Sequence, residues 1–325
     1  MRKSKALSGI AGHACRLAVG AGLALSTMAG VSAAQTLGIG TTSGGATGQI
    51  GIAIAQRISE GSDLRALPQV SGNTSQYIPI VDAGRIDLGV ANYPQIFYAI
   101  AGTGMSSEPS KNLRLVATLM PFLAGLITAE DSGIKTYAEI KDRKVPRYPP
   151  NSLGDFVIRA TLAAGGLTYD DVVSVPVANF PQQYEAFKTR DIDVSIASVG
   201  AQPTFEIEST VGDIQFIPLP KDAAQKMQEF LPGAYLQDIP ASETLPGLDE
   251  PTTVLAYDYL LFGNANVPDE VIAKVAKSMY EGAEKLKTSS PVWADFDRSQ
   301  MGKKGNIPYH PGALGYYREV GIAGE

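Results

Sequence analysis

Residues Leu37–Ile58 read LGIGTTSGGATGQIGIAIAQRI and set the plan of the chain. They predict a short buried strand, a loop of glycines and hydroxyl side chains, and a helix. Ile50, Ile54 and Ile58 recur four residues apart, which is typical of the buried face of a helix. Because the loop is rich in donors and precedes a helix N-terminus, it suits an anion or a carboxylate.

The composition indicates a globular protein, and the N-terminal segment indicates that it is exported. The chain has 325 residues, of which 44% are hydrophobic and 18% charged, enough for two domains with a core. Arg2, Lys3 and Lys5 precede an apolar run at 17–31 and the small residues before Ala34. This order predicts a signal peptide over residues 1–34, cleaved near Ala33 or Ala34. A membrane anchor is the alternative, but the run is short and rich in alanine and glycine.

Removal of residues 1–34 changes the chemistry that the chain can offer. Cys15 and His13 are lost, so the mature chain has no cysteine and a single histidine, His310. Four basic residues are lost as well, which leaves 23 Lys and Arg against 33 Asp and Glu, a net charge of about −10. This charge argues against nucleic-acid binding. Together with the predicted signal peptide, these features predict an acidic, cysteine-free periplasmic protein.

An internal repeat predicts two lobes. Residues 84–92 (GRIDLGVAN) and 190–198 (RDIDVSIAS) share a pattern, and Asn73 precedes Asn92 by the same 19 residues that separate Asn179 from Ser198. Each lobe is expected to alternate strands and helices around a mostly parallel sheet, in a two-lobed α/β periplasmic-binding-protein fold. Two long apolar strands, 113–128 and 252–263, are expected to cross between the lobes. The predicted lobes are 35–122 with 256–325, and 123–255, and polar loops at the strand ends would face a cleft.

The sequence contains parts of several catalytic patterns, but none of these patterns is complete. The glycines at 38, 40 and 44 approximate a dinucleotide fingerprint, but no acid follows the next strand. Ser132 and Lys135 have an S-x-x-K spacing without its companion motifs. His310 is more consistent with a structural role than with a triad, and one histidine without cysteine cannot form a transition-metal site. Asp87 and Asp193 occupy the same place in the two repeats, which favours a structural role. We therefore expect no enzyme, cofactor or metal.

Several segments in order along the chain resemble the TAXI solute receptors, the extracytoplasmic components of TRAP transporters. They are IGTTSGG from residue 39, SGNT from 71, GRIDLG from 84, DSGIK from 131 and YHPGALGYY from 309. The resemblance implies a receptor that closes on a small organic acid or amino acid. It also implies delivery to a membrane permease driven by an ion gradient.

The resemblance and the loops together give a set of expected ligand-binding residues. In the first lobe they are Thr41, Thr42, Ser43, Thr47, Ser71, Asn73, Thr74 and Asn92, and in the second Arg147, Asn151, Ser152, Ser198 and Gln202. Arg147 and Tyr148 stand where family members usually have small or aliphatic residues. Either Arg147 binds a ligand carboxylate, or it pairs with a surface acid while Tyr148 packs.

The function expected from these observations is an extracytoplasmic solute-binding receptor. A secreted hydrolase is the alternative, but it needs a positioned nucleophile and base that the sequence does not offer. A structural envelope protein is a third possibility, although it has no need of convergent polar loops.

Overall fold

The computed structural model describes residues 35–324. The predicted signal peptide, with His13 and Cys15, lies outside the described residues. Within 35–324, no helix is both long enough and apolar enough to cross a membrane.

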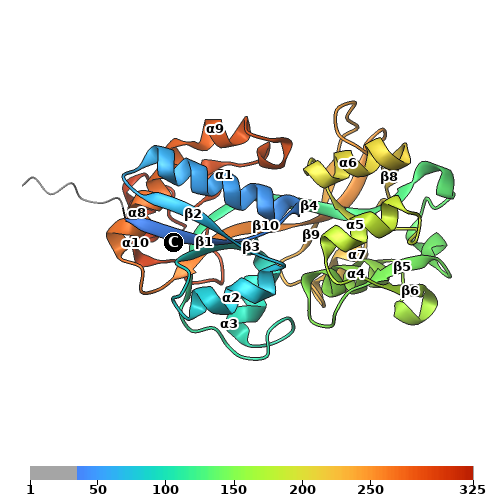
Figure 1. Ribbon diagram of the computed structural model, residues 1–325, viewed down its shortest axis with the longest axis horizontal. Helices are drawn as coiled ribbons and strands as arrows, with labels where there is room; N and C mark the ends of the chain where they lie inside the picture. The colour runs from blue at the N-terminus through green and yellow to red at the C-terminus, as the bar shows by residue number, and fades with distance from the viewer. Residues whose placement is uncertain (1–34, 325) are drawn as a thin grey trace, which may run out of the picture. The chain divides into compact units, whose positions relative to one another are not determined.

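The N-terminal part of the described chain alternates strands and helices (Figure 1). The elements are β1 (Thr36–Thr42), α1 (Gly45–Gly61), β2 (Arg65–Ser71), α2 (Thr74–Asp82), β3 (Leu88–Asn92) and α3 (Tyr93–Ala101). Strand β1 pairs in parallel with β2 on one side and with β3 on the other. The carboxyl ends of these strands therefore meet at one edge of the sheet, next to the helix N-termini.

The helices cover both faces of this sheet. Ile50, Ile54 and Ile58 of α1 are fully buried, which confirms the predicted face, and they share a core cluster with Val90 of β3. Helices α2 and α3 pack in another cluster that contains Ala91, the next residue of β3. Successive residues of a strand point to opposite faces, so α1 lies on one side of the sheet and α2 and α3 lie on the other (Figure 1).

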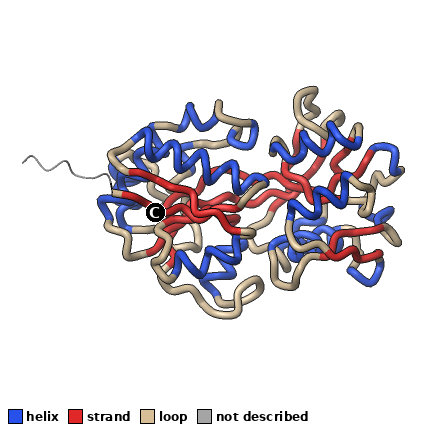
Figure 2. Tube along the Cα trace, in the orientation of Figure 1, coloured by secondary structure: helices blue, strands red, loops and turns tan. Residues whose placement is uncertain are grey.

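Two long strands run through both lobes, as predicted. Strand β4 (Leu113–Ala129) has 17 residues and β10 (Thr252–Asn264) has 13, and they pair antiparallel with each other (Figure 2). Pro121 lies inside β4 in register with Asp258, and the pairing with β10 is irregular between this pair and the pair of Thr118 with Leu260. Strand β10 also pairs with β3, and β4 also pairs with β7, so one sheet connects the two lobes.

The second lobe repeats the alternation and adds a short helix and two antiparallel strands. Its elements are β5 (Lys144–Arg147), α4 (Leu153–Ala164), β6 (Val173–Pro176), α5 (Phe180–Lys188), β7 (Ser195–Ser198), α6 (Gln202–Val211), β8 (Ile214–Phe216), α7 (Ala223–Gln228) and β9 (Tyr235–Ile239). Strands β5 and β6 are parallel. The sequence did not predict β9, which pairs with β10 between two proline-rich turns. The α/β, two-lobed fold class is confirmed.

The repeat is visible in the hydrogen bonds that join the strands. The Gly38 N–H donates to Asp87 Oδ2 at 2.8 Å, and the Lys144 N–H donates to Asp193 Oδ2 at 2.7 Å. Both bonds span 49 residues. Each carboxylate thus satisfies a backbone donor of a strand, Gly38 in β1 and Lys144 in β5. These bonds support the structural role expected for the two aspartates.

The C-terminal segment packs on the first lobe through α8 (Asp269–Glu281), α9 (Ala283–Lys287) and α10 (Pro311–Glu319). His310 is fully buried, and its Nδ1 accepts the Gly312 N–H at 3.3 Å, so it caps α10. The histidine therefore has the structural role that the sequence favours.

Candidate ligand-binding site

A cavity of about 80 Å³ lies where the helix N-termini of the two lobes meet the crossing strands. It has room for several water molecules or for part of a small organic molecule. Its lining residues come from β1–α1, β2–α2, β3, β4, α4, α5, β7 and β10; they are Thr42–Thr47, Gly72–Ser75, Asn92, Phe122, Tyr148, Ser152–Gly154, Val157, Ala178–Pro181, Tyr184, Ile196, Ser198 and Tyr257.

The N-terminus of α1 is the main source of backbone donors. Helix α1 has 17 residues, its N-cap is Gly44, and no side chain caps its first turn. Gly44, Gly45, Ala46 and Thr47 all line the cavity, and Gly45 has a φ of 72°, which glycine adopts without strain. The first N–H groups of a helix have no partner within the helix, and the helix dipole makes this end positive. The end of α1 can therefore receive an anion.

Two threonines add hydroxyl donors with a defined direction. Tyr259 on β10 donates a hydrogen bond to Thr47 Oγ1, and Gln95 on α3 donates one to Thr74 Oγ1. Within the described chain, neither threonine hydroxyl donates to another group. Since each oxygen already accepts a proton from the protein, the hydroxyl proton of each threonine is available to a ligand.

Two asparagines contribute amide donors in the same way. Asn73 Oδ1 accepts the Gln76 N–H at 3.2 Å, and Asn179 Oδ1 accepts the Gln182 N–H at 3.0 Å. These caps of α2 and α5 fix which end of each amide carries the oxygen, because a backbone N–H needs an acceptor. The Nδ2 groups of both asparagines remain as donors.

Asn92 is a third asparagine in the lining, and it is only 2% exposed. Its backbone N–H donates to Gln95 Oε1 at 3.3 Å. Its Oδ1 is buried and lies beside the Gln95 N–H in the capping box of α3, but among residues 35–324 it makes no hydrogen bond of ordinary geometry. A buried polar atom without a partner costs stability, so this side chain is suited to meet a group of the ligand.

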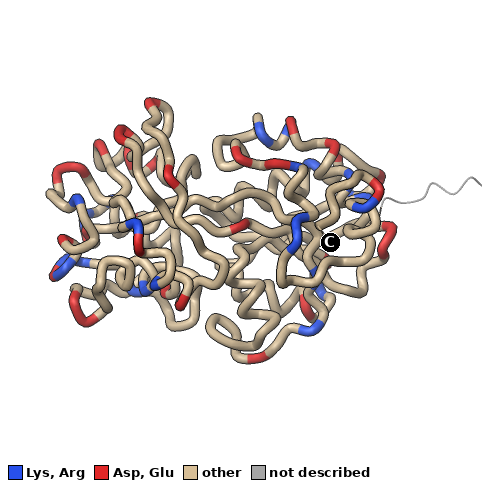
Figure 3. Tube along the Cα trace, turned by 180° about the vertical axis from the view of Figure 1, so that it is seen from behind, with Lys and Arg blue, Asp and Glu red and all other residues tan. Residues whose placement is uncertain are grey.

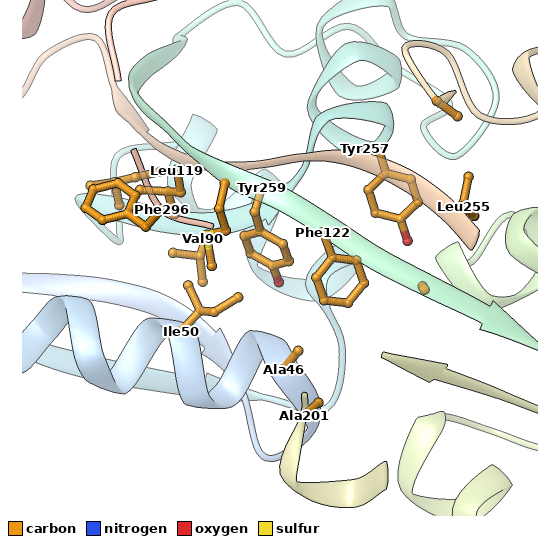
Figure 4. Close-up of a cluster of buried hydrophobic side chains, with 14 of the residues drawn as sticks. Ala46, Ile50, Val90, Leu119, Phe122, Ala201, Leu255, Tyr257, Tyr259 and Phe296 are labelled. Atoms are coloured by element: carbon orange, nitrogen blue, oxygen red, sulfur yellow. The ribbon is translucent and has the colours of Figure 1, made fainter. Parts of the chain in front are cut away.

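Five aromatic rings line the same cavity and form its aromatic wall: Phe122, Tyr148, Phe180, Tyr184 and Tyr257. Phe122 on β4 and Tyr257 on β10 stack with their ring centres 5.6 Å apart, and Figure 4 shows Phe122 between Tyr257 and Ala46 at the start of α1. On the second lobe, the Phe180 ring lies 5.3 Å from that of Tyr148 and 6.3 Å from that of Tyr184. Burial raises the pKa of the Tyr148, Tyr184 and Tyr257 hydroxyls, so these side chains stay neutral.

The lining carries no Lys, Arg, Asp, Glu or His among the described residues. Figure 3 shows most charged positions on the outer parts of the two lobes rather than along the crossing strands. The arrangement therefore offers neutral donors and apolar rings. It can bind an anion with an apolar body, and the lining does not supply a nucleophile paired with a base.

The structure brings eight of the expected ligand-binding residues to the cavity. They are Thr42, Ser43, Thr47, Asn73, Thr74, Asn92, Ser152 and Ser198. Two of their hydroxyl protons are used within the protein, because Thr42 Oγ1 donates to the Gly44 carbonyl at 2.8 Å and Ser152 Oγ donates to the Pro149 carbonyl at 2.8 Å.

The other five expected residues lie outside the lining. Thr41 is buried and its hydroxyl donates to the Thr47 carbonyl at 2.9 Å, while the Ser71 carbonyl accepts the Ser43 N–H at 3.1 Å. Asn151 lines a smaller cavity beside Gln95, and Gln202 lines the outer groove between α1 and α6.

Arg147 is exposed, and its guanidinium lies 4.0 Å above the Tyr169 ring. Together with Arg159 and Phe230 it lines a separate surface cavity. Tyr148, the next residue, is 3% exposed and faces the main cavity. The structure therefore does not bring Arg147 to the neutral donors.

Sequence reasoning missed the aromatic wall and Asn179 as site residues. The repeat offered a signal for Asn179, because it matches Asn73. Phe122 and Tyr257 lie on the crossing strands, where a cleft between two lobes has its floor. This position could have distinguished them from ordinary core residues.

Residues 39–321 match the NMT1-like family. The chain belongs to the NMT1-like family. Solved structures similar to this NMT1-like protein include the periplasmic aliphatic sulphonate binding protein SsuA from Escherichia coli, with 17% identity, a TM-score of 0.47, and 80% of this chain and 78% of that chain covered. Another is the alkanesulfonate-binding protein SsuA from Xanthomonas axonopodis pv. citri bound to MOPS, with 14% identity and a TM-score of 0.48. This match covers 88% of the present chain and 79% of that chain.

Proposed function

We propose that this protein is a periplasmic solute-binding receptor, not an enzyme, which captures a small organic anion between its two lobes. The observation that supports this most directly is the uncapped N-terminus of α1 beside the available hydroxyls of Thr47 and Thr74. Such a site stabilises negative charge without a counter-ion. A hydrolase would need a nucleophile and a base in the same cavity, and the lining does not contain that pair.

The proposal includes a closing movement. Lobe I would comprise 35–122 with 256–325, and lobe II would comprise 123–255. The crossing strands β4 and β10 would act as the hinge, with Phe122 and Tyr257 on the cavity floor. The contact between the Gln202 N–H and Gln49 Oε1, at 3.4 Å, joins α6 to α1 and is of the kind that closure would form.

The resemblance to TAXI receptors supports a more specific role. The loaded receptor would deliver its ligand to an ion-gradient-driven TRAP-type permease in the membrane. The predicted signal peptide is consistent with this route.

A thermal-shift screen of residues 35–325 against organic acids, amino acids and neutral sugars tests the proposal. A ligand that binds only the folded state raises the melting temperature by mass action. We expect organic anions to stabilise the protein and to be recovered chemically unchanged by NMR after incubation. Turnover of a stabilising compound would support the hydrolase, and stabilisation by sugars alone would contradict an anion receptor.

A further inference from the structure

We infer that the ligand is an organic anion with an aromatic or similarly bulky apolar body and without an ammonium group. This inference rests on the proposed receptor function and specifies the class of ligand. It follows from three independent features of the cavity: the direction of its hydrogen bonds, the absence of a side-chain carboxylate from its lining, and its aromatic wall.

The hydrogen-bond directions select an anionic group. Thr47, Thr74, Asn73 and Asn179 each use their oxygen to accept a bond from the protein, so each presents a donor. The uncapped first turn of α1 adds backbone donors to the same cavity. Hydrogen bonds to an ionised acceptor are about twice as strong as neutral ones, so this group of donors favours a carboxylate or another oxyanion.

The same features disfavour an amino acid. An ammonium group has three donors and a positive charge, which a buried site compensates with a carboxylate. No Asp or Glu lines the cavity within the described residues. The buried Asn92 Oδ1 is one neutral acceptor that makes no hydrogen bond of ordinary geometry, and it matches a single hydroxyl or ring N–H better than an ammonium.

The aromatic wall defines the body of the ligand. Phe122 and Tyr257 contribute rings from the crossing strands, and Tyr148, Phe180 and Tyr184 contribute rings from the second lobe. Aromatic pairs with ring centres 4.5–7 Å apart gain energy beyond the burial of their area. A ring in the cavity could make such contacts with both groups, whereas acetate or succinate would leave the wall uncovered.

Matched probes separate these features. The panel contains benzoate, phenylacetate and 3-phenylpropanoate, and changes one property of phenylacetate at a time: L-phenylglycine adds the ammonium, phenylacetamide removes the charge, and acetate removes the ring. Isothermal titration and thermal shift on residues 35–325 would report binding. We expect at least one of the three aromatic carboxylates to bind at least tenfold more tightly than L-phenylglycine, phenylacetamide and acetate.

A variant tests the wall directly. Phe180 is half-buried at the start of α5, so Phe180→Leu removes a ring without opening the core. We expect the variant to bind the best aromatic carboxylate about 2- to 10-fold more weakly. Phe205→Leu on α6 is the matched control, because Phe205 is 36% exposed and does not line the cavity.

The possible outcomes distinguish the inference from the proposed function. Preferential binding of L-phenylglycine or acetate would overturn the inference and leave an anion receptor in place. Equal binding of the aromatic carboxylate by Phe180→Leu and the parent protein would overturn the role of the wall. If no organic anion binds at millimolar concentration, both the inference and the receptor function are wrong.

Discussion

The hydroxyl of Thr74 offers a sharp test of the donor arrangement. Thr74 is 7% exposed, lines the cavity and accepts a hydrogen bond from Gln95, which is 4% exposed. Thr74→Val removes the hydroxyl and nearly preserves the volume. A hydrogen bond to a charged acceptor contributes about 1.5–3 kcal/mol, so the Kd for an anionic ligand should rise about 10- to 150-fold. Loss of the partner of Gln95 should also lower the free energy of unfolding by about 1–3 kcal/mol.

Thr41→Val is the matched control for this experiment. Thr41 lies on β1, is fully buried and does not line the cavity. Its hydroxyl donates to the Thr47 carbonyl. This substitution should lower the free energy of unfolding by about 1 kcal/mol and leave the Kd within about threefold of the parent value. Isothermal titration measures the Kd and urea denaturation the stability. Unchanged binding by Thr74→Val, or equal loss of binding in the two variants, would refute the donor arrangement.

Three further predictions concern the framework of the site. Gly51→Ala should destabilise the protein by about 1–3 kcal/mol in urea, because the added Cβ would lie 2.2 Å from Thr41 Oγ1, whereas Gly305→Ala has open space and should be neutral. Asp87→Ala and Asp193→Ala should each cost about 1–3 kcal/mol and speed hydrogen exchange at the Gly38 and Lys144 amides, respectively; protection unchanged at either amide would argue against the repeated bond. Burial lowers the pKa of His310, an effect that Arg114 reinforces and Asp269 partly opposes, so its stability contribution is complete above about pH 6.5 and falls as the pH drops towards the lowered value. His310→Asn keeps a capping acceptor and should lose less stability than the parent between pH 7 and 5; parallel losses would contradict the assignment.

Much of the fold could be predicted because it repeats. The period of Ile50, Ile54 and Ile58 identified the buried face of α1, and the matched Asp87 and Asp193 revealed the two alternating segments. Strand β9 was missed although β10 is the next strand along the chain. Its five residues, YLQDI, do not alternate between apolar and polar side chains, and they include an aspartate, a residue that is uncommon in strands.

The site was harder to predict because neighbouring residues of a strand point in opposite directions. Arg147 and Tyr148 are adjacent, yet the arginine stacks on Tyr169 at the surface and the tyrosine faces the cavity. The loop after a strand can be recognised from the sequence. Which of two neighbouring side chains enters the cleft cannot, because a shift of one residue along the strand turns each side chain to the opposite face. The sequence also could not predict that the hydroxyl protons of Thr47 and Thr74 are available to a ligand. Their availability depends on hydrogen bonds donated by Tyr259 and Gln95, which belong to other elements.

Hydrogen–deuterium exchange with and without a stabilising aromatic carboxylate would test the central claim most directly. If the cavity at the end of α1 holds the anion, the ligand should protect the amides of residues 44–48 and the starts of α2 and α5. Residues 167–170, which line the separate surface cavity beside Arg147, should exchange at the same rate in both states. Protection confined to that segment, with unchanged exchange at the start of α1, would contradict this account.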